Sequence, residues 1–489
     1  MKPAMRQART LMVQGTGSGV GKSMLVAALC RIFKKKGWRV SPFKAQNMSN
    51  NSCVTAEGGE IARAQAMQAE CAGVEPSIHM NPVLLKPHSN TGSQVVVHGK
   101  AIKPMQVEAY YRIRQVLMSK VEDSFRWLSR RFDLVIIEGA GSPAEINLRQ
   151  FDFANMKMAR MAKAPVILAG DIERCGVFAA LYGTYALLTR AERRMVRGFV
   201  INKFRGNEHL LTPGIKYLEK KTGVPFLGTI PYLEGLFLDE EDSLDSFDPV
   251  RQGGVDVAVF RFPRISNFTD MKPLELEPNV RVRYFTGAEE FGSPDLVILP
   301  GTKSTVSDAD FLKKRGIGPL LKRHAARGGA ILGICGGFQM LGRIIKDSGG
   351  VESARKRVPG LGLLPVDTFF EAEKVARKIQ TQIDIRVNGR PIRGKVSGYE
   401  IHMGRTPASR SLKGKGGIFQ RGSVYGTYLH GLFDNDAFRR NFFAALAGRD
   451  KGGDQGSASF VRARRKSYAR IAREVEKALD MKRIQSLLC

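Results

Sequence analysis

The sequence predicts an α/β protein built from two doubly wound domains, each a mainly parallel sheet between layers of helices. Short β-branched runs alternate with longer helical stretches through both halves of the chain. The length of 489 residues exceeds that of one ordinary domain. The alternation breaks at residues 236–254, where acidic side chains gather and Gly253-Gly254 follows. We interpret this stretch as an acidic linker rather than a dedicated binding loop.

The first domain is predicted over residues 1–235. β-branched runs bounded by turn residues indicate six strands, at Thr10–Gln14, Val40–Ala45, Leu134–Glu138, Pro165–Ala169, Gly198–Asn202 and Phe226–Ile230. Longer stretches between them predict helices, among them Lys22–Lys36, Glu60–Ala72 and Val107–Arg130.

The second domain is predicted over residues 255–445. Its strands are expected at Val255–Phe260, Val280–Phe285, Leu296–Leu299, Ala330–Ile334 and Val424–Leu429. Residues 446–489 then form a basic C-terminal extension, in which apolar residues recur at helical spacing. We expect a terminal helix whose basic face is solvated, with nucleic-acid contact as the weaker alternative.

Composition narrows the function classes. Hydrophobic residues make up 43% of the chain and charged residues 25%, which excludes a disordered chain. No apolar run approaches the roughly 18 to 20 residues of a membrane helix, and the start holds no apolar signal core. Six cysteines without a CxxC pair indicate a reducing cytoplasm rather than a disulfide framework. The net charge of +31 indicates anionic ligands, and composition does not separate nucleic acid from small anionic substrates or a basic host proteome.

A glycine-rich loop predicts a phosphate site. Gly15-Thr-Gly-Ser-Gly-Val-Gly-Lys22-Ser23 follows a predicted strand and opens a predicted helix, as a P-loop does. Gly17, Gly19 and Gly21 let backbone N–H groups turn toward the phosphates of ATP. Lys22 then neutralises phosphate charge, and Ser23 offers its hydroxyl to Mg²⁺. The strict pattern has glycine at the position of Thr16.

Three further residues lie at the carboxyl ends of other predicted strands of the same sheet, where they can reach the P-loop. Glu138, in Leu134-Val-Ile-Ile-Glu138-Gly-Ala-Gly-Ser142, is placed for a second Mg²⁺ contact, with a structural acid as the alternative. Asp171 holds an equivalent position with weaker support. Lys44 is placed to reach a transferred phosphoryl group, with an ordinary exposed lysine as the alternative.

A second chemical centre is predicted around Cys335. Ala330-Ile-Leu-Gly-Ile-Cys335-Gly-Gly-Phe-Gln339-Met-Leu-Gly342 reads as a strand, a tight turn and a helix. This nucleophile elbow projects the thiol into a cleft, and the helix N-terminus favours the thiolate. Gly336 leaves room for N–H groups that hold an oxyanion. His430 is the preferred base, and His402 is the rival.

The first half resembles the dethiobiotin synthetase and cobyrinate amidase branch of P-loop proteins, which shares Thr at position 16 and the Glu-Gly-Ala-Gly turn after residue 137. The resemblance implies a dethiobiotin-synthetase-like domain that uses ATP to activate a carboxylate as an acyl phosphate. Partitioning ATPases of similar fold carry a signature lysine where this chain has Gly17.

The second half resembles triad-type (class I) glutamine amidotransferase domains. The resemblance implies that Cys335 forms a glutamyl thioester and that His430 is its base. It also implies that Gly301, in Pro300-Gly-Thr-Lys-Ser304, acts with Gly336 and Gln339 on the glutamine and its oxyanion. The common pattern has glutamate at the position of Leu432, so Glu400 and Asp434 remain as candidates to orient His430.

The two halves together resemble the cobyrate and cobyrinate amidotransferase family, which ligates glutamine-derived ammonia to carboxylates at the expense of ATP. The cobyrate branch is favoured by segments 44–52, 64–69, 81–87, 92–99 and 398–404. The resemblance implies stepwise amidation of the b, d, e and g carboxylates of adenosylcobyrinic a,c-diamide to adenosylcobyric acid, in cobalamin biosynthesis.

That resemblance also implies which partners to expect. These are the corrinoid, ATP and glutamine, with cobalt carried by the substrate, and with neither nucleic acid nor a membrane; a homodimer is compatible with the sequence. Five polar residues are expected to contact the substrate, although an ordinary polar loop is an equally good interpretation of them: Asn47, Asn50, Asn51, Gln65 and Lys86. Three alternatives remain: an a,c-diamide synthase, a nucleic-acid-associated P-loop ATPase, and an interaction protein with an inactive site.

Overall fold

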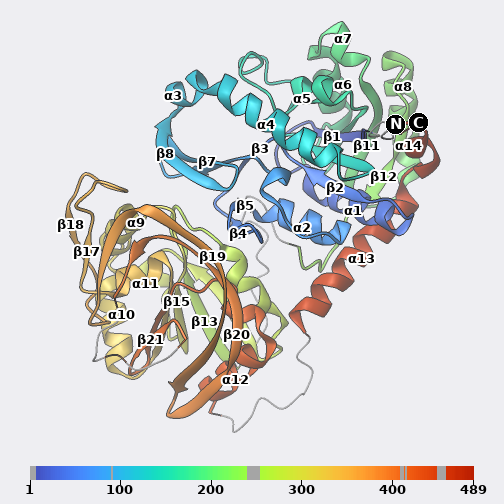
Figure 1. Ribbon diagram of the computed structural model, residues 1–489. Coiled ribbons are helices and arrows are strands. Elements are labelled where there is room, and N and C mark those ends of the chain that lie inside the picture. The colour runs from blue at the N-terminus through green and yellow to red at the C-terminus, as the bar shows by residue number, and fades with distance from the viewer. Residues whose placement is uncertain are drawn as a thin grey trace, which may run out of the picture.

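The computed structural model describes residues 7–89, 92–238, 254–407, 412, 416–448 and 459–488. Residues 239–253 of the predicted acidic linker, and residues 449–458 of the predicted extension, lie outside the described residues. Figure 1 shows two α/β bodies, with the last long helix lying along the first of them. The predicted fold class is confirmed.

The first body is organised around a six-stranded parallel sheet. In spatial order its strands are β12 (Phe226–Pro231), β11 (Val196–Phe204), β10 (Val166–Asp171), β1 (Arg9–Gly15), β9 (Leu134–Glu138) and β2 (Val40–Phe43). Alternate residues of β1 face opposite sides, because strand side chains have a period of two. Met12 joins the core on one side of the sheet, whereas Leu11 and Val13 join the core on the other.

Helices cover both faces of this sheet, as the doubly wound prediction requires. One face carries α1 (Lys22–Lys35) and α2 (Arg63–Ala72). The other carries α4 (Arg114–Ser129), α5 (Met156–Ala162), α6 (Val177–Leu187) and α8 (Thr212–Thr222). The predicted helix Val107–Arg130 is two helices, because α3 (Val107–Arg112) ends before Ile113.

Small strands between β2 and α3 were not predicted. β3 (Gln46–Met48), β6 (Val83–Pro87), β7 (Gly92–Val97) and β8 (Lys100–Gln106) form a four-stranded sheet, and β4 (Ser52–Val54) pairs with β5 (Glu60–Ala62). The prediction of helix from Glu60 was therefore wrong over its first three residues. Pairing of Ser52 with Ala62 fixes those residues as a buried strand, and tertiary context overrides helix propensity there.

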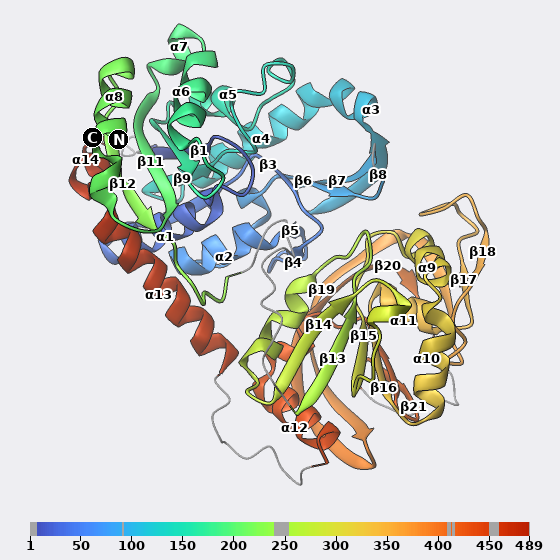
Figure 2. The same cartoon turned by 180° about the vertical axis from the view of Figure 1, so that it is seen from behind.

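The second body contains another six-stranded sheet, parallel except for one edge strand. Its order is β14 (Val280–Phe285), β13 (Val255–Phe260), β15 (Leu296–Leu299), β16 (Ala330–Ile334), β22 (Val424–Thr427) and β21 (Ile418–Arg421). Figure 2 shows β14, β13 and β15 side by side. The main helices are α9 (Thr305–Lys314), α10 (Ile317–Ala326), α11 (Gly336–Leu341) and α12 (Asp436–Leu446).

A long antiparallel hairpin, also absent from the prediction, lies against this body. Its strands β19 (Asp367–Val387) and β20 (Arg390–Arg405) join β17 (Ile344–Lys346) and β18 (Arg357–Pro359) in a separate sheet. β20 also contacts β4 of the first body: Val54 packs with Tyr399 and Ile401 in one buried cluster. The hairpin therefore forms part of the surface on which the two bodies meet.

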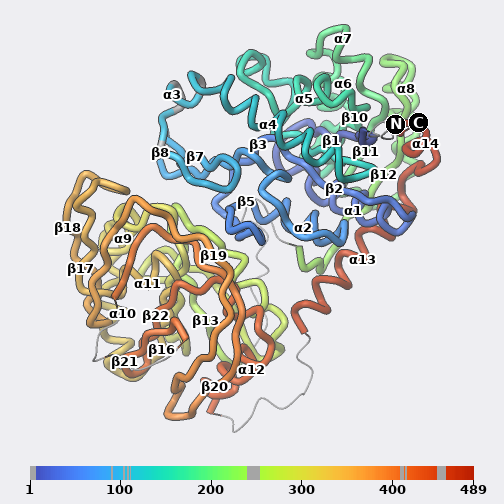
Figure 3. The backbone as a smooth tube through the Cα atoms, viewed as in Figure 1, coloured from blue at the N-terminus to red at the C-terminus, as the bar shows by residue number. Residues whose placement is uncertain are grey.

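The C-terminal helices return to the first body (Figure 3). Among them, α13 (Phe460–Ala478) buries Tyr468, Ile471 and Val475 in the same core as α1, and α14 (Met481–Ser486) follows. Leu479 bridges to Gly228 of β12. The amphipathic pattern predicted the helix, but only the structure shows that its apolar face packs on the first sheet. Among the described residues, no helix combines the length and apolarity that a bilayer crossing needs.

Candidate active sites

The P-loop connects β1 to α1, as predicted. Gly19 and Gly21 have φ angles of 73° and 92°, a left-handed conformation that glycine adopts without a Cβ penalty. Gly21 caps α1, so the positive end of the helix dipole faces the loop. The Lys22 ammonium donates to the carbonyl oxygens of Gly17 at 2.7 Å and Gly141 at 3.0 Å. This arrangement holds the lysine over the loop, where phosphate groups of a nucleotide bind.

Glu138 is the centre of a buried polar network beside the loop. Its Oε1 accepts hydrogen bonds from Ser23 Oγ and from Lys44 Nζ, each at 2.8 Å. Its Oε2 accepts from Gln68 at 2.5 Å and from Gln65 at 3.2 Å. The structure thus brings together three predicted residues from three separate strand ends. Lys44 is only 3% exposed, so the alternative of an ordinary exposed lysine does not hold.

Asp171 does not join this network in the described structure. Its carboxylate pairs with Lys203 at 2.9 Å and with Arg174 at 3.6 Å. Those two cations neutralise Asp171 on the other side of the P-loop, where the Arg174 guanidinium also approaches Gly19. Glu138 is therefore the stronger candidate for the metal-side carboxylate.

The polar residues expected to touch substrate are mostly engaged inside the protein. Asn47 donates to Gln65 at 2.9 Å, and Asn51 accepts from the N–H of Phe268 at 3.2 Å. Lys86 donates to Glu60 at 2.5 Å. All except Asn50 are buried, so in this conformation they build the network around Glu138 and the contact between the two bodies.

Cys335 lies at the turn between β16 and α11, as the elbow motif predicted. Its φ of 51° and ψ of −110° are strained for a residue with a side chain. The neighbouring glycines are needed because the turn is crowded: a Cβ on Gly337 would lie 1.9 Å from the Leu299 carbonyl oxygen. The strained turn therefore holds the thiol in one position, next to His430 and the Ile401 carbonyl.

His430 is fully buried and is oriented by Asp270, a residue that the sequence did not single out. Its Nδ1 donates to Asp270 Oδ2 at 2.7 Å, and Asp270 Oδ1 accepts from the N–H of Gly431 at 2.9 Å. Burial lowers the pKa of His430, but the charge and hydrogen bond of Asp270, and then Cys335, raise it to about 10. The cysteine, histidine and aspartate thus form a hydrogen-bonded set.

Neither candidate from the sequence occupies the position of Asp270. Glu400 pairs with Arg377 at 2.9 Å and lies 3.8 Å from His402. Asp434 lies beside Gly431, whereas the Nδ1 atom of His430 is engaged by Asp270. His402 donates from Nδ1 to the Gly404 carbonyl at 2.6 Å and its ring stacks on Tyr428, and these contacts remove it from the base position. No local signal marks Asp270, because it lies on the 3-10 helix Phe268–Leu276, 160 residues before His430.

The predicted oxyanion residues divide into two groups. Gly301 lies against His430 and Gly336 lies against Thr302. Within the part of the chain that the structure describes, the N–H groups of these two glycines have no hydrogen-bond partner, which leaves them as donors for an oxyanion. Gln339 instead uses both ends of its amide inside the core, accepting from Thr305 at 3.0 Å and donating to Tyr428 at 3.3 Å.

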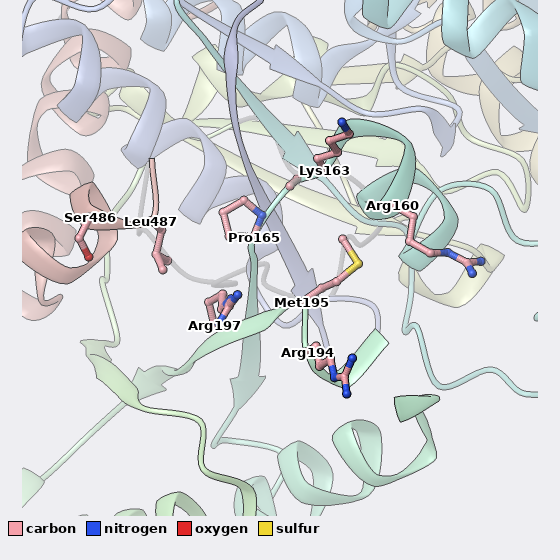
Figure 4. A pocket seen from close by; sticks show the side chains of 9 residues that line it. Arg160, Lys163, Pro165, Arg194, Met195, Arg197, Ser486 and Leu487 are labelled. Carbon is pink, nitrogen blue, oxygen red and sulfur yellow. The ribbon is translucent and has the colours of Figure 1, made fainter. Parts of the chain in front are cut away.

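A cavity of about 630 Å³ lies away from both centres, at the amino ends of β10 and β11 (Figure 4). The P-loop follows the carboxyl end of β1, which is the opposite edge of the sheet. The cavity wall carries the exposed cations Arg160, Lys163, Arg194 and Arg197. Exposed cations of this kind are expected on a chain with 77 Lys and Arg residues, so the cavity is not assigned to either reaction.

Comparison with known proteins accounts for both centres. Residues 11–244 match the CobQ/CobB/MinD/ParA nucleotide binding domain, and residues 256–438 match the CobB/CobQ-like glutamine amidotransferase domain. A cobyric acid synthase of Pelotomaculum thermopropionicum is 46% identical over 98% of this chain and 97% of its own length. Another, of Sorangium cellulosum, is 47% identical over 97% of each chain. A third, of Dehalococcoides mccartyi strain CBDB1, is 45% identical over 98% of this chain and 99% of its own.

Proposed function

The chain belongs to the cobyric acid synthase family, and from this premise we propose that it amidates the b, d, e and g carboxylates of adenosylcobyrinic a,c-diamide in turn. Glutamine-dependent amidation in cobalamin biosynthesis is the activity of the family. The observation that carries the proposal is that one chain holds both a P-loop site, around Lys22 and Glu138, and a buried Cys335–His430–Asp270 set.

Ammonia is released at the second body in the proposed mechanism. The Cys335 thiolate attacks the amide carbon of glutamine, and the N–H groups of Gly301 and Gly336 hold the oxyanion. His430 Nε2 gives its proton to the leaving nitrogen, so ammonia departs and a glutamyl thioester remains. His430 then removes a proton from water, which cleaves the thioester to glutamate and regenerates the thiolate. Asp270 fixes the tautomer and stabilises the imidazolium throughout.

Activation of the carboxylate takes place at the first body. Lys22 and Lys44 neutralise phosphate charge, while a substrate carboxylate oxygen attacks the γ-phosphorus of ATP and ADP departs. Ammonia then attacks the acyl phosphate carbon, inorganic phosphate leaves, and an amide remains. The N–H groups of the P-loop bind the phosphates at the N-terminus of α1, where Gly21 is the N-cap.

The donor set beside the P-loop fits Mg²⁺. The Ser23 hydroxyl and the Glu138 carboxylate are hard oxygen ligands, and they already lie 2.8 Å apart. When bound, the ion neutralises charge on the phosphates of ATP. We assign Ser23 and Glu138 to that role, with Lys44 as the charge that compensates Glu138 when the ion is absent.

An assay with ATP, Mg²⁺ and glutamine tests the proposal, with each corrin acid supplied separately and the products weighed by mass spectrometry. Adenosylcobyrinic a,c-diamide is expected to gain four amides in steps. Two amidations of cobyrinic acid, with no change of the a,c-diamide, would instead assign the chain to the a,c-diamide synthase activity. Turnover of neither acid would reject the corrinoid substrate.

A further inference from the structure

Asn267, a residue of the second body, lies between Ser52 of the first body and the catalytic histidine, His430. Its Oδ1 accepts a hydrogen bond from the N–H of Ser52 at 2.9 Å, and its Nδ2 lies 3.4 Å from His430 Nε2. The adjacent N–H of Phe268 donates to Asn51 at 3.2 Å, so the contact is reciprocal. Ser52, Asn51 and Asn267 are at most 3% exposed. A single side chain, that of Asn267, therefore separates β4 of the first body from Nε2, the nitrogen of His430 that transfers the proton.

The amide of Asn267 has only one orientation that satisfies this contact. An amide has an acceptor end and a donor end, and the Ser52 N–H requires the acceptor end. The donor end must then face His430 Nε2. Because Asp270 takes the proton on Nδ1, Nε2 is the atom that exchanges a proton with Cys335. The N–H donor of Asn267 can hydrogen-bond to the lone pair on Nε2 of the neutral imidazole. It repels the N–H that Nε2 carries in the imidazolium.

The same segment is tied at its other end to the nucleotide site. Asn47 donates to Gln65, and Gln65 donates to Glu138, which also holds Ser23 and Lys44. Ser52 follows Asn47 by only five positions in the chain. A ligand that draws Ser23 or Lys44 away from Oε1 of Glu138 changes the charge balance of the carboxylate whose Oε2 accepts from Gln65, and so acts on this segment.

A buried ion cluster fixes the middle of the contact. The Ser52 hydroxyl donates to Glu60 at 2.6 Å, and Glu60 also accepts from Lys86 of the first body and Lys374 of the second, each at 2.5 Å. Removing a partner from such a cluster leaves a buried charge uncompensated. Ser52 is thus held firmly between Glu60 and Asn267, and a shift of either body is transmitted to the amide.

We propose that Asn267 is a positioning residue that makes glutamine hydrolysis conditional on the state of the nucleotide site. In the docked arrangement its donor end faces Nε2 and makes the imidazolium of His430 less stable than an acceptor at that place would, so thioester formation is slower. When the Asn47–Ser52 segment moves, the amide is free to rotate and present Oδ1 to the Nε2 proton, which favours the reactive ion pair. This inference rests on the proposed roles of Cys335 and His430.

The backbone at position 267 suggests which substitution tests the switch. Asn267 has a φ of 51°, a left-handed conformation that asparagine and aspartate tolerate better than other side chains. Asn267→Asp keeps that backbone and offers an acceptor both to the Ser52 N–H and to the Nε2 proton. Asn267→Ala removes both interactions. The matched control is Lys378→Ala, which deletes an exposed ion pair between the bodies, Lys378 with Glu75 at 3.6 Å, far in sequence from Asn267.

The experiment measures glutamate release by the full chain with and without ATP and the corrin acid, together with amidation driven by free ammonia. For the wild type and Lys378→Ala we expect release to be stimulated by the two ligands. For Asn267→Asp we expect the unstimulated rate to rise about two- to ten-fold, the worth of one hydrogen bond, and the stimulation ratio to fall toward one. For Asn267→Ala we also expect the stimulation ratio to fall toward one. Amidation driven by free ammonia should be unchanged in both variants.

Other results would reject the switch. A wild type without stimulation overturns it, as does an Asn267→Asp variant that keeps the wild-type ratio or whose unstimulated rate falls. A wild type that amidates with neither glutamine nor ammonia would instead contradict the proposed function. The two failures are therefore distinguishable.

Discussion

The Asp270 carboxylate accepts a hydrogen bond from His430 Nδ1 at 2.7 Å, although 160 residues separate the two along the chain. Both side chains are buried, so no solvent competes for the bond. The resemblance to amidotransferases predicts a glutamate at position 432, where this chain has Leu432. We propose that Asp270 orients His430 instead.

We expect Asp270→Asn to lower the glutamine-dependent rate by about 10²- to 10⁴-fold, because the neutral amide no longer stabilises the imidazolium or its tautomer. Ammonia-driven amidation should remain. The pKa of His430 should drop from about 10 toward its ordinary value. Glu400→Gln is the control, since Glu400 pairs with Arg377 instead. Equal losses in the two variants would contradict the assignment.

Cys335→Ala is expected to abolish glutamine hydrolysis, because it removes the thiol that lies beside His430. Amidation with free ammonia should continue near the wild-type rate, since the P-loop site belongs to the other body. Product mass and glutamate release are the measurements. If a folded variant also fails with ammonia, the division of labour between the two bodies is wrong.

Lys44→Met should suppress ATP-dependent amidation by at least about 10²-fold with either nitrogen source, because a phosphate-neutralising charge is removed. Glutamate release should persist. The variant should also lose about 3–5 kcal/mol of unfolding free energy in the first body, since Glu138 is left buried without its cation.

The double variant Lys44→Met with Glu138→Gln separates these two effects. Removing the stranded charge should recover much of the stability in urea unfolding, while amidation stays suppressed. Recovery of amidation in the double variant would show that Lys44 acts only by compensating Glu138.

His430 should also make stability depend on pH. Its folded pKa of about 10 lies above the ordinary value of 6.5, so its contribution is complete below pH 6.5 and is lost as pH rises through about 10. The difference in unfolding free energy between the wild type and His430→Gln should therefore shrink from pH 7 to pH 10. A constant difference over that range would mean that the ring is not held as the imidazolium.

Ile471→Ala tests the return of the terminal helix. Ile471 is fully buried against the core that contains α1, and its truncation should cost about 2–5 kcal/mol of unfolding free energy. Arg465→Ala, on the exposed side of α13, should stay within about 0.5 kcal/mol of the wild type. Comparable effects of the two substitutions in urea unfolding would contradict the packing described here.

Patterns confined to a short stretch predicted most of the fold. All six strands of the first sheet, and five of the six in the second, lie at runs that the sequence marks. The hairpin of β19 and β20 was missed because charged and other exposed residues interrupt the apolar alternation along both strands. The packing of α13 on the first sheet was missed because an amphipathic helix reveals its apolar face but not the surface that covers it.

The sequence by itself determined the two chemistries, because the P-loop and the cysteine elbow are local motifs whose backbone conformation depends on adjacent glycines. Only the tertiary structure decided which distant side chains complete them: Glu138 with Lys44, His430 with Asp270, and Asn267 between the two bodies. The reason is physical. A local motif is specified by backbone geometry within a few residues, whereas a buried carboxylate or amide is matched to its partner by the folding of segments far apart in the chain.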